Sequence, residues 1–288
     1  MLPWSLSGAP GVGASRERAL WNTGAWDRAK LPEALGQVGV KGPRAAAVVA
    51  HVERWDALVA ARDACALHAM LPTRERWRVL PLVLEGAAFV DIETDGRDTP
   101  EGITAVCLRS RDRASCWLRA TGRDPDWSIL EGASALVSFN GLAFDVPMLV
   151  KAWPAIPVPQ IHLDLVAVAR RMRWLGGLKA IERMAGWQRA PHVENLRGGD
   201  AIALWSLWLQ AGDRAVLQRL CEYNMEDVWS LPFLAAWAHD HLAARTLGSV
   251  PGAPKPAPLR TSWLERDQGG PLMLAAVADA LHAVPVQL

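Results

Sequence analysis

The chain carries little net charge and no obvious cysteine pattern. Its formal net charge is only +1 over 288 residues, so no global positive field favours nucleic acid, and binding of a polyanion would need local positive charge. The four cysteines lie far apart and form no Cys-x-x-Cys pair. This spacing argues against a zinc site or a disulfide framework and indicates buried thiols in a reducing compartment.

Long apolar runs are also missing. No stretch of about 18 uninterrupted apolar residues is present, which argues against a membrane span. The opening residues, MLPWSLSGAPGVGASRER, lack the charged start and apolar run of a signal peptide. We therefore expect a cytoplasmic protein with no membrane partner. Apolar residues make up 51% and charged residues 21% of the chain, which is the balance of a globular protein.

The first part of the chain has a helical pattern. The run Pro43–Met70 is predicted to be one helix, because Pro43 suits a first helical turn and Pro72 lies just beyond the end. The spacing of its apolar residues places five of them on one face: Val48, Val52, Trp55, Leu58 and Val59. We assign residues 1–82 to an N-terminal helical region.

The pattern then changes to short apolar runs without a helical period. Five strands are predicted, at residues 86–92, 103–108, 116–118, 135–139 and 161–163. Helices are predicted between and after the later strands, at residues 144–152, 165–174, 178–185, 201–209 and 214–239. This order indicates an α/β fold with a mixed five-stranded sheet flanked by helices, over residues 83–245. Residues 246–288 form a Pro-rich linker and a tail, in which Pro271–Val284 suits an amphipathic helix.

Two acids stand at the end of the first predicted strand, in the segment FVDIETDG. Asp91 and Glu93 are two residues apart, so both side chains project from the same face of a strand. Two carboxylates this close repel each other unless a cation lies between them. An isolated pair of this kind is also compatible with a solvated strand end.

A third acid follows the fourth predicted strand, in SFNGLAFDVPML. Asn140 and Gly141 form a turn, and Asp145 falls in the first turn of the next helix, where its charge complements the helix dipole. A plain helix-start acid, with Asn140 as a turn former, is the alternative.

The only tyrosine of the chain lies beside the fourth acid, in CEYNMEDVWSL. Tyr223 and Asp227 are four residues apart and share one face of a predicted helix. Glu226 points elsewhere on this helix and is expected to face solvent. Such a pair is common on ordinary helices and becomes informative only together with the two preceding segments.

The three segments, in this order, resemble the motifs of the DEDD superfamily of 3′→5′ exonucleases. Asp91 and Glu93 match the first motif, Asn140 to Asp145 the second, and Tyr223 with Asp227 the third, in its Tyr-bearing form. The stretch HLDLVAVARRMRWLGGLKAIERMAGWQR is similar to the YprB-like branch, with Gly177 in place of its usual serine. The resemblance covers Leu84 to His241 and implies a ribonuclease-H-like fold.

The same resemblance implies a site for two ions, Mg²⁺ or Mn²⁺. Asp91 would bridge both ions, Glu93 and Asp227 would complete the shell of the ion that activates water, and Asp145 would hold the second. Hard cations take oxygen ligands, which suits these residue types. Tyr223 would orient the attacking water, because a phenol with a pKa near about 10 is a poor general base.

Local positive charge lies between the second and third motifs. Six basic residues oppose only Asp164 and Glu182 there. The predicted contacts to a nucleic-acid backbone are Asn140, Arg170, Arg171, Lys179 and Arg189. Ordinary solvated helix faces would have the same composition. His162 and Asp164, at the end of the fifth strand, would support the metal ligands from behind or serve only in the core or a turn.

These features predict a metal-dependent 3′→5′ exonuclease that acts on the ends of single-stranded DNA or RNA. DNA is favoured, although the motifs do not separate the two sugars. A structure-selective endonuclease on the same fold is an alternative. A catalytically weak module that docks nucleic acid or a repair partner is another, but the presence of all four carboxylates and Tyr223 argues against an inactive site.

Overall fold

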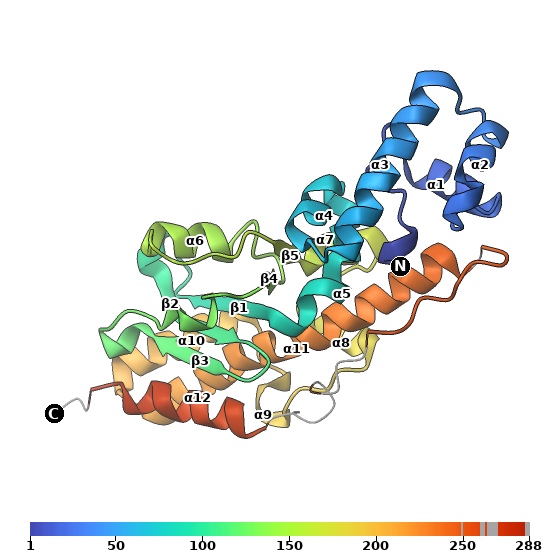
Figure 1. The fold of residues 1–288 in the computed structure, drawn as a ribbon. Helices are drawn as coiled ribbons and strands as arrows, with labels where there is room; N and C mark the ends of the chain where they lie inside the picture. The colour runs from blue at the N-terminus through green and yellow to red at the C-terminus, as the bar shows by residue number, and fades with distance from the viewer. Residues whose placement is uncertain (249, 260–262, 264–269, 286–288) are drawn as a thin grey trace. The chain divides into compact units, whose positions relative to one another are not determined.

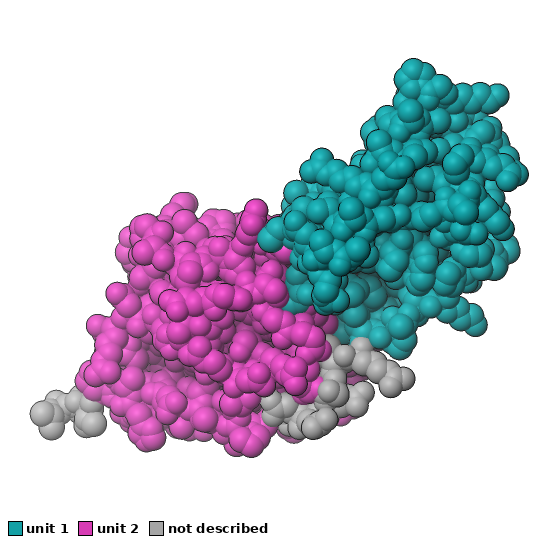
Figure 2. All heavy atoms as spheres, viewed as in Figure 1, with its two compact units in different colours: residues 1–83, 236–260 teal, residues 84–235, 261–288 magenta. Residues whose placement is uncertain are grey.

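The computed structural model describes residues 1–248, 250–259, 263 and 270–285. Contacts divide the chain into two compact units, Met1–Val83 with Ala236–Arg260, and Leu84–Ala235 with Thr261–Leu288 (Figure 2). The first division falls next to the predicted boundary at residues 82 and 83. The predicted domains themselves, 1–82, 83–245 and 246–288, stay a prediction, and residues 249, 260–262, 264–269 and 286–288 lie outside the described part.

The first unit is helical. Its elements are η1 (Leu2–Trp4), α1 (Ala14–Asn22), η2 (Arg28–Lys30), α2 (Leu31–Gln37), α3 (Gly42–Ala60), α4 (Ala64–Met70), η3 (Thr73–Val79) and α5 (Leu80–Val83). The single helix predicted over Pro43–Met70 is wrong, because the run is broken between α3 and α4. Arg62 adopts a left-handed φ of 55°, and the Asp63 side chain then caps α4 by accepting from the Ala66 N–H.

The interior of this unit contains a buried ion group. The Arg78 guanidinium donates to Glu17 at 2.7 Å and to Glu75 at 2.9 Å, and its side chain is 1% exposed. Two acids around one cation leave no buried positive charge unpaired, which is the condition for holding an arginine in a protein interior. The aromatic ring of Trp77 lies 5.5 Å from the same guanidinium.

The second unit is built on a five-stranded sheet in the order β3-β2-β1-β4-β5 (Figure 1). The strands are β1 (Ala87–Thr94), β2 (Ile103–Arg109), β3 (Ala114–Leu118), β4 (Ala135–Ser138) and β5 (His162–Asp164). β1, β2 and β3 pair antiparallel, whereas β1, β4 and β5 pair parallel. The predicted mixed five-stranded sheet is confirmed. The parallel strands bring the carboxyl ends of β1, β4 and β5 to the same edge.

Helices and short 3-10 turns complete the second unit. They are η4 (Leu84–Gly86), η5 (Pro100–Gly102), η6 (Arg119–Thr121), η7 (Trp127–Ile129), α6 (Asp145–Ala152), α7 (Leu165–Met172), α8 (Leu178–Ala185), α9 (Pro191–Glu194), α10 (Gly198–Ala211), α12 (Pro271–His282) and the first part of α11 (Arg214–Leu247). α11 continues past the predicted end at residue 239, and its residues from 236 onward belong to the first unit.

The side chains of β1 alternate between the two faces of the sheet. Val90 and Ile92 pack in a cluster with Met148 and Leu149 of α6. Asp91 lies on the opposite face, where Asn224 of α11 contacts it. Figure 1 shows α6 on one side of the sheet and α10 and α11 on the other. The alternation therefore points the acids of β1 toward α11 while the residues between them fill the apolar core.

The four cysteines are free, as the sequence indicated. Three of them are buried, Cys107, Cys116 and Cys221, and Cys65 is partly buried. Among the described residues no helix is both long and apolar enough to cross a membrane.

Candidate metal centre

Asp91 and Glu93 lie near the carboxyl end of β1, on the face that α11 covers. Asp91 pairs in register with Cys107 of β2 and is half-buried, while Glu93 is 9% exposed. A register shift follows directly after Glu93. The two carboxylates thus share one face, as the alternation of a strand requires.

Asp145 reaches β1 from the start of α6. One of its oxygens accepts a hydrogen bond of 3.1 Å from the backbone N–H of Ile92, which lies between the two acids of β1. The loop before α6 has a tight shape, because Asn140 adopts a φ of 70° and a Cβ on Gly141 would lie 2.3 Å from the Ser138 hydroxyl. Glycine is therefore required at residue 141 for the chain to place Asp145 there.

α11 supplies the remaining acid and its neighbours. An oxygen from each of Asp91, Glu93 and Asp227 lies within 4.8 Å of the other two. Tyr223 is buried one helical turn before Asp227. Between them, the fully buried Asn224 donates from Nδ2 to the second oxygen of Asp91 at 2.7 Å. α11 therefore both adds a carboxylate and holds one of the acids of β1.

The carboxylates have strongly perturbed ionisation. Burial, with the charges of Asp227 and Asp145 adding to it, raises the pKa of Asp91 and that of Glu93 well above their usual range. Burial raises the pKa of Asp145 to about 7 and that of Asp227 to about 6, the latter against the opposing charge of Arg189. The cluster carries more negative charge than the protein neutralises. Close, buried carboxylate oxygens of this kind fit hard divalent cations.

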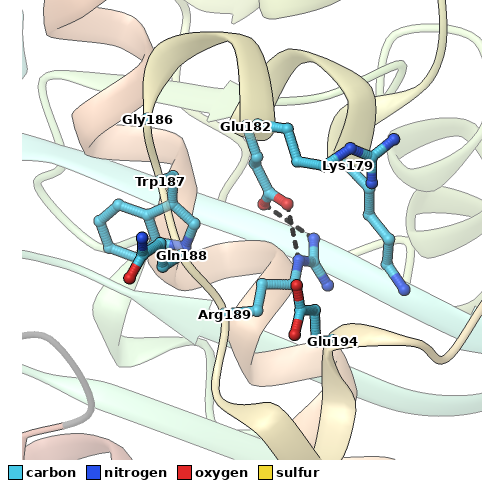
Figure 3. Close-up of a pocket in the computed structure, with 8 residues that line it drawn as sticks. Lys179, Glu182, Gly186, Trp187, Gln188, Arg189 and Glu194 are labelled. Atoms are coloured by element: carbon cyan, nitrogen blue, oxygen red, sulfur yellow. Dashed lines mark hydrogen bonds and ion pairs between the residues drawn. The ribbon is translucent and has the colours of Figure 1, made fainter.

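Lys179 and Arg189 lie beside the cluster. The Lys179 ammonium is 4.6 Å from the centre of the Tyr223 ring, and Arg189 makes an ion pair with Asp227. Both residues line a pocket of about 270 Å³ between α8 and the segment that follows it (Figure 3). The sequence predicted both as backbone contacts, which stays a prediction. The structure adds that Arg189 is 8% exposed and already paired.

Asp164 and His162, at the two ends of β5, contact the segment that carries the second motif. The carboxylate of Asp164 accepts from the backbone N–H groups of Asn140 at 2.8 Å, Leu142 at 3.2 Å and Val166 at 2.9 Å. A ring nitrogen of His162 is 2.7 Å from the Ser138 hydroxyl. These contacts fix the loop that leads to Asp145, and the predicted supporting role of both residues stays a prediction.

The other predicted contacts are spread along the surface. Arg170 is exposed and Arg171 partly buried near the end of α7, and Asn140 is exposed in the loop after β4. Their predicted contact with a nucleic-acid backbone stays a prediction.

Three buried polar residues were not identified correctly from the sequence. Asn224 did not enter the prediction, and Glu182 entered it as a charge opposing the basic segment and as part of the stretch that resembles the YprB-like branch. The prediction that Glu226 faces solvent is wrong, because its side chain is 6% exposed and accepts from the Ala190 N–H at 3.3 Å. For Asn224, the only signal in the sequence was a neutral amide in the middle of a helix that carries acids.

A comparison with protein families decides the superfamily. The model of the RNase H superfamily matches residues 88–239, which include all four carboxylates and Tyr223. The chain belongs to the RNase H superfamily. Neither a curated protein nor a solved structure matches it significantly. Membership of the RNase H superfamily suggests a nuclease that binds nucleic acid, and nucleases with this fold generally use divalent metals.

Proposed function

We propose that this protein is a two-metal-ion 3′→5′ exonuclease of the DEDD Tyr type, in the YprB-like branch, acting on single-stranded ends with DNA favoured over RNA. The observation that carries the proposal is the approach of Asp91, Glu93 and Asp227 within 4.8 Å. Glu93 and Asp227 are buried and Asp91 is half-buried, and three carboxylates this close repel each other unless a cation lies between them.

Each acid has a distinct role in the proposal. Asp91 would contact both Mg²⁺ or Mn²⁺ ions, Glu93 and Asp227 would hold the first, and Asp145 would hold the second. When bound, such ions neutralise phosphate charge, increase the acidity of water and stabilise the leaving oxygen. Asn224 supports this set, since its hydrogen bond of 2.7 Å fixes one oxygen of Asp91.

Tyr223 would orient the attacking water by a hydrogen bond. Burial, with the charges of Asp227 and Glu93 adding to it, raises the pKa of its phenol above the usual 10, so the side chain stays protonated at neutral pH. A protonated phenol donates a hydrogen bond but does not remove a proton. Tyr223→Phe should therefore keep its affinity for Mn²⁺ while turnover falls by about 100-fold or more. Loss of Mn²⁺ binding in a titration would contradict this role.

Basic residues would hold the strand. Lys179 lies next to Tyr223, and α7 carries Arg170 and Arg171 in its last turn. Contacts of this kind neutralise backbone phosphates without reading sequence, so binding should weaken steeply as the salt concentration rises.

The deciding experiment uses 5′-labelled single-stranded DNA and RNA with Mg²⁺ or Mn²⁺. Wild type should give a ladder that shortens from the 3′ end, whereas Asp91→Asn, Asp145→Asn and wild type with EDTA should not. Glu131→Gln, a change at an exposed acid of the same unit, is the control and should match wild type. Internal cuts instead of a ladder would favour a structure-selective endonuclease. Binding without any cleavage would favour a docking module for nucleic acid or a repair partner.

A further inference from the structure

A buried ion group adjoins the candidate metal centre. Arg189 donates from Nε to one oxygen of Glu182 at 2.6 Å and from Nη2 to the other at 2.8 Å. The same Nη2 contacts Oδ1 of Asp227. The side chains of Arg189 and Glu182 are 3% and 2% exposed. Figure 3 shows the two side chains facing each other across the turn that follows α8.

The geometry fixes one positive charge on a candidate metal ligand. A guanidinium does not lose its proton in a protein, so Arg189 stays charged under all ordinary conditions. Its two hydrogen bonds to Glu182 match the fork of the guanidinium to both carboxylate oxygens, which is the strongest form of this pair. Glu182 therefore holds Arg189 in place while Nη2, which also donates to Glu182, contacts Asp227.

The charges of Arg189 and Glu182 have opposite effects on the binding of a cation at the carboxylate cluster. Arg189 neutralises part of the charge of Asp227 in the absence of metal, and it repels a divalent cation that Asp227 would hold. Glu182 acts in the opposite sense, because its negative charge compensates Arg189. In a buried site both effects are large, since interactions between charges are screened far less there than in water.

We propose that Arg189, positioned by Glu182, is the built-in counter-cation of the carboxylate cluster and sets how tightly the cluster binds its divalent cation. This inference rests on the proposed metal centre. It assigns opposite effects to the two members of one ion pair. A pair that served only as a scaffold would have the same effect whichever member was removed.

The test measures Mn²⁺ affinity directly, without an activity assay. Metal-free protein is titrated with Mn²⁺ and the free ion is counted by electron paramagnetic resonance. Arg189→Gln should lower the dissociation constant by at least about tenfold, because a competing charge is lost. Glu182→Gln should raise it by about tenfold, because the charge of Arg189 is no longer compensated. Arg189→Lys keeps the charge and should stay near wild type.

The control is an exposed ion pair of the same unit. Arg111 and Glu85 are 3.0 Å apart with side chains 49% and 55% exposed. Arg111→Gln and Glu85→Gln make the same charge changes and should leave the Mn²⁺ affinity unchanged. Circular dichroism confirms that each variant is folded, and if Arg189→Gln is not, Arg189→Met removes the same charge and takes its place.

The outcomes separate this inference from the proposed function. Weaker binding in both Arg189→Gln and Glu182→Gln, or an affinity equal to wild type in both, would overturn the counter-cation role and leave the metal centre intact. An absence of saturable Mn²⁺ binding in wild type would overturn both.

Discussion

Neutralising Asp145 should change how the stability of the metal-free protein depends on pH. Asp145→Asn keeps a side-chain oxygen that can accept from the Ile92 N–H, as the carboxylate does at 3.1 Å. The substitution removes a buried negative charge and little else. Its effect on the free energy of unfolding therefore reports the electrostatic penalty of the cluster.

The magnitude follows from the pKa of this carboxyl, which burial raises from its usual 3.8 to about 7. Between these values the folded state holds a proton that the unfolded state has lost, so stability falls as the pH rises and the penalty is complete above about pH 7. An experiment that compares pH 5 with pH 8 covers about two pH units of this window, from pH 5 to about pH 7. At about 1.4 kcal/mol per pH unit, the free energy of unfolding of Asp145→Asn relative to wild type should be about 3 kcal/mol higher at pH 8 than at pH 5.

The assay is urea unfolding at pH 5 and pH 8 in EDTA. Adding Mg²⁺ or Mn²⁺ at pH 8 should stabilise wild type more than the variant, since the cation offsets the charge that the variant lacks. Asp164→Asn is the control of opposite sign. Its carboxylate accepts from three backbone N–H groups, so its loss should lower stability at pH 8 by about 1–3 kcal/mol.

The reasoning is refuted if the difference in unfolding free energy between Asp145→Asn and wild type is the same at both pH values, or is more favourable to the variant at pH 5. Either result would mean that the ionised carboxylate of Asp145 does not destabilise the metal-free folded protein.

Two further substitutions test the support of the site and the interior of the helical unit. Asn224→Ala removes the donor that holds Asp91 at 2.7 Å, and the dissociation constant for Mn²⁺ should rise by about tenfold or more; an unchanged titration would rule out that role. Arg78→Met leaves Glu17 and Glu75 buried without their counter-charge, and urea unfolding should show a loss of about 3–5 kcal/mol. A loss below about 1 kcal/mol would mean that solvent reaches this group.

Most of the sheet follows from local sequence. The runs at residues 86–92 and 135–139 are apolar except for Asp91 and Ser138, which is typical of strands covered on both sides. They lie within one residue or two of β1 and β4. The shared face of Asp91 and Glu93 and the shared helix face of Tyr223 and Asp227 follow from the periods of a strand and a helix.

Features that depend on a chain reversal or on tertiary packing did not follow. The break between α3 and α4 depends on the left-handed Arg62, a residue type without a preference for that conformation. The pair of Glu182 and Arg189 spans seven residues and forms because Gly186, at a φ of 86°, turns the chain back along α8. Asn224 and Glu226 are buried by partners far away in the sequence, which no local period reveals.

The hydrogen bonds of Asp164 also constrain the order in which the protein can fold. The loop from Asn140 to Leu142 takes its shape from a carboxylate that follows it by more than twenty residues. The second motif is therefore not held until β5 has paired with β4, and Asp227 arrives later still along the chain. During synthesis the acids would meet only after most of the sheet exists. The carboxylate cluster is thus completed only after the strands that carry its first acids have been made.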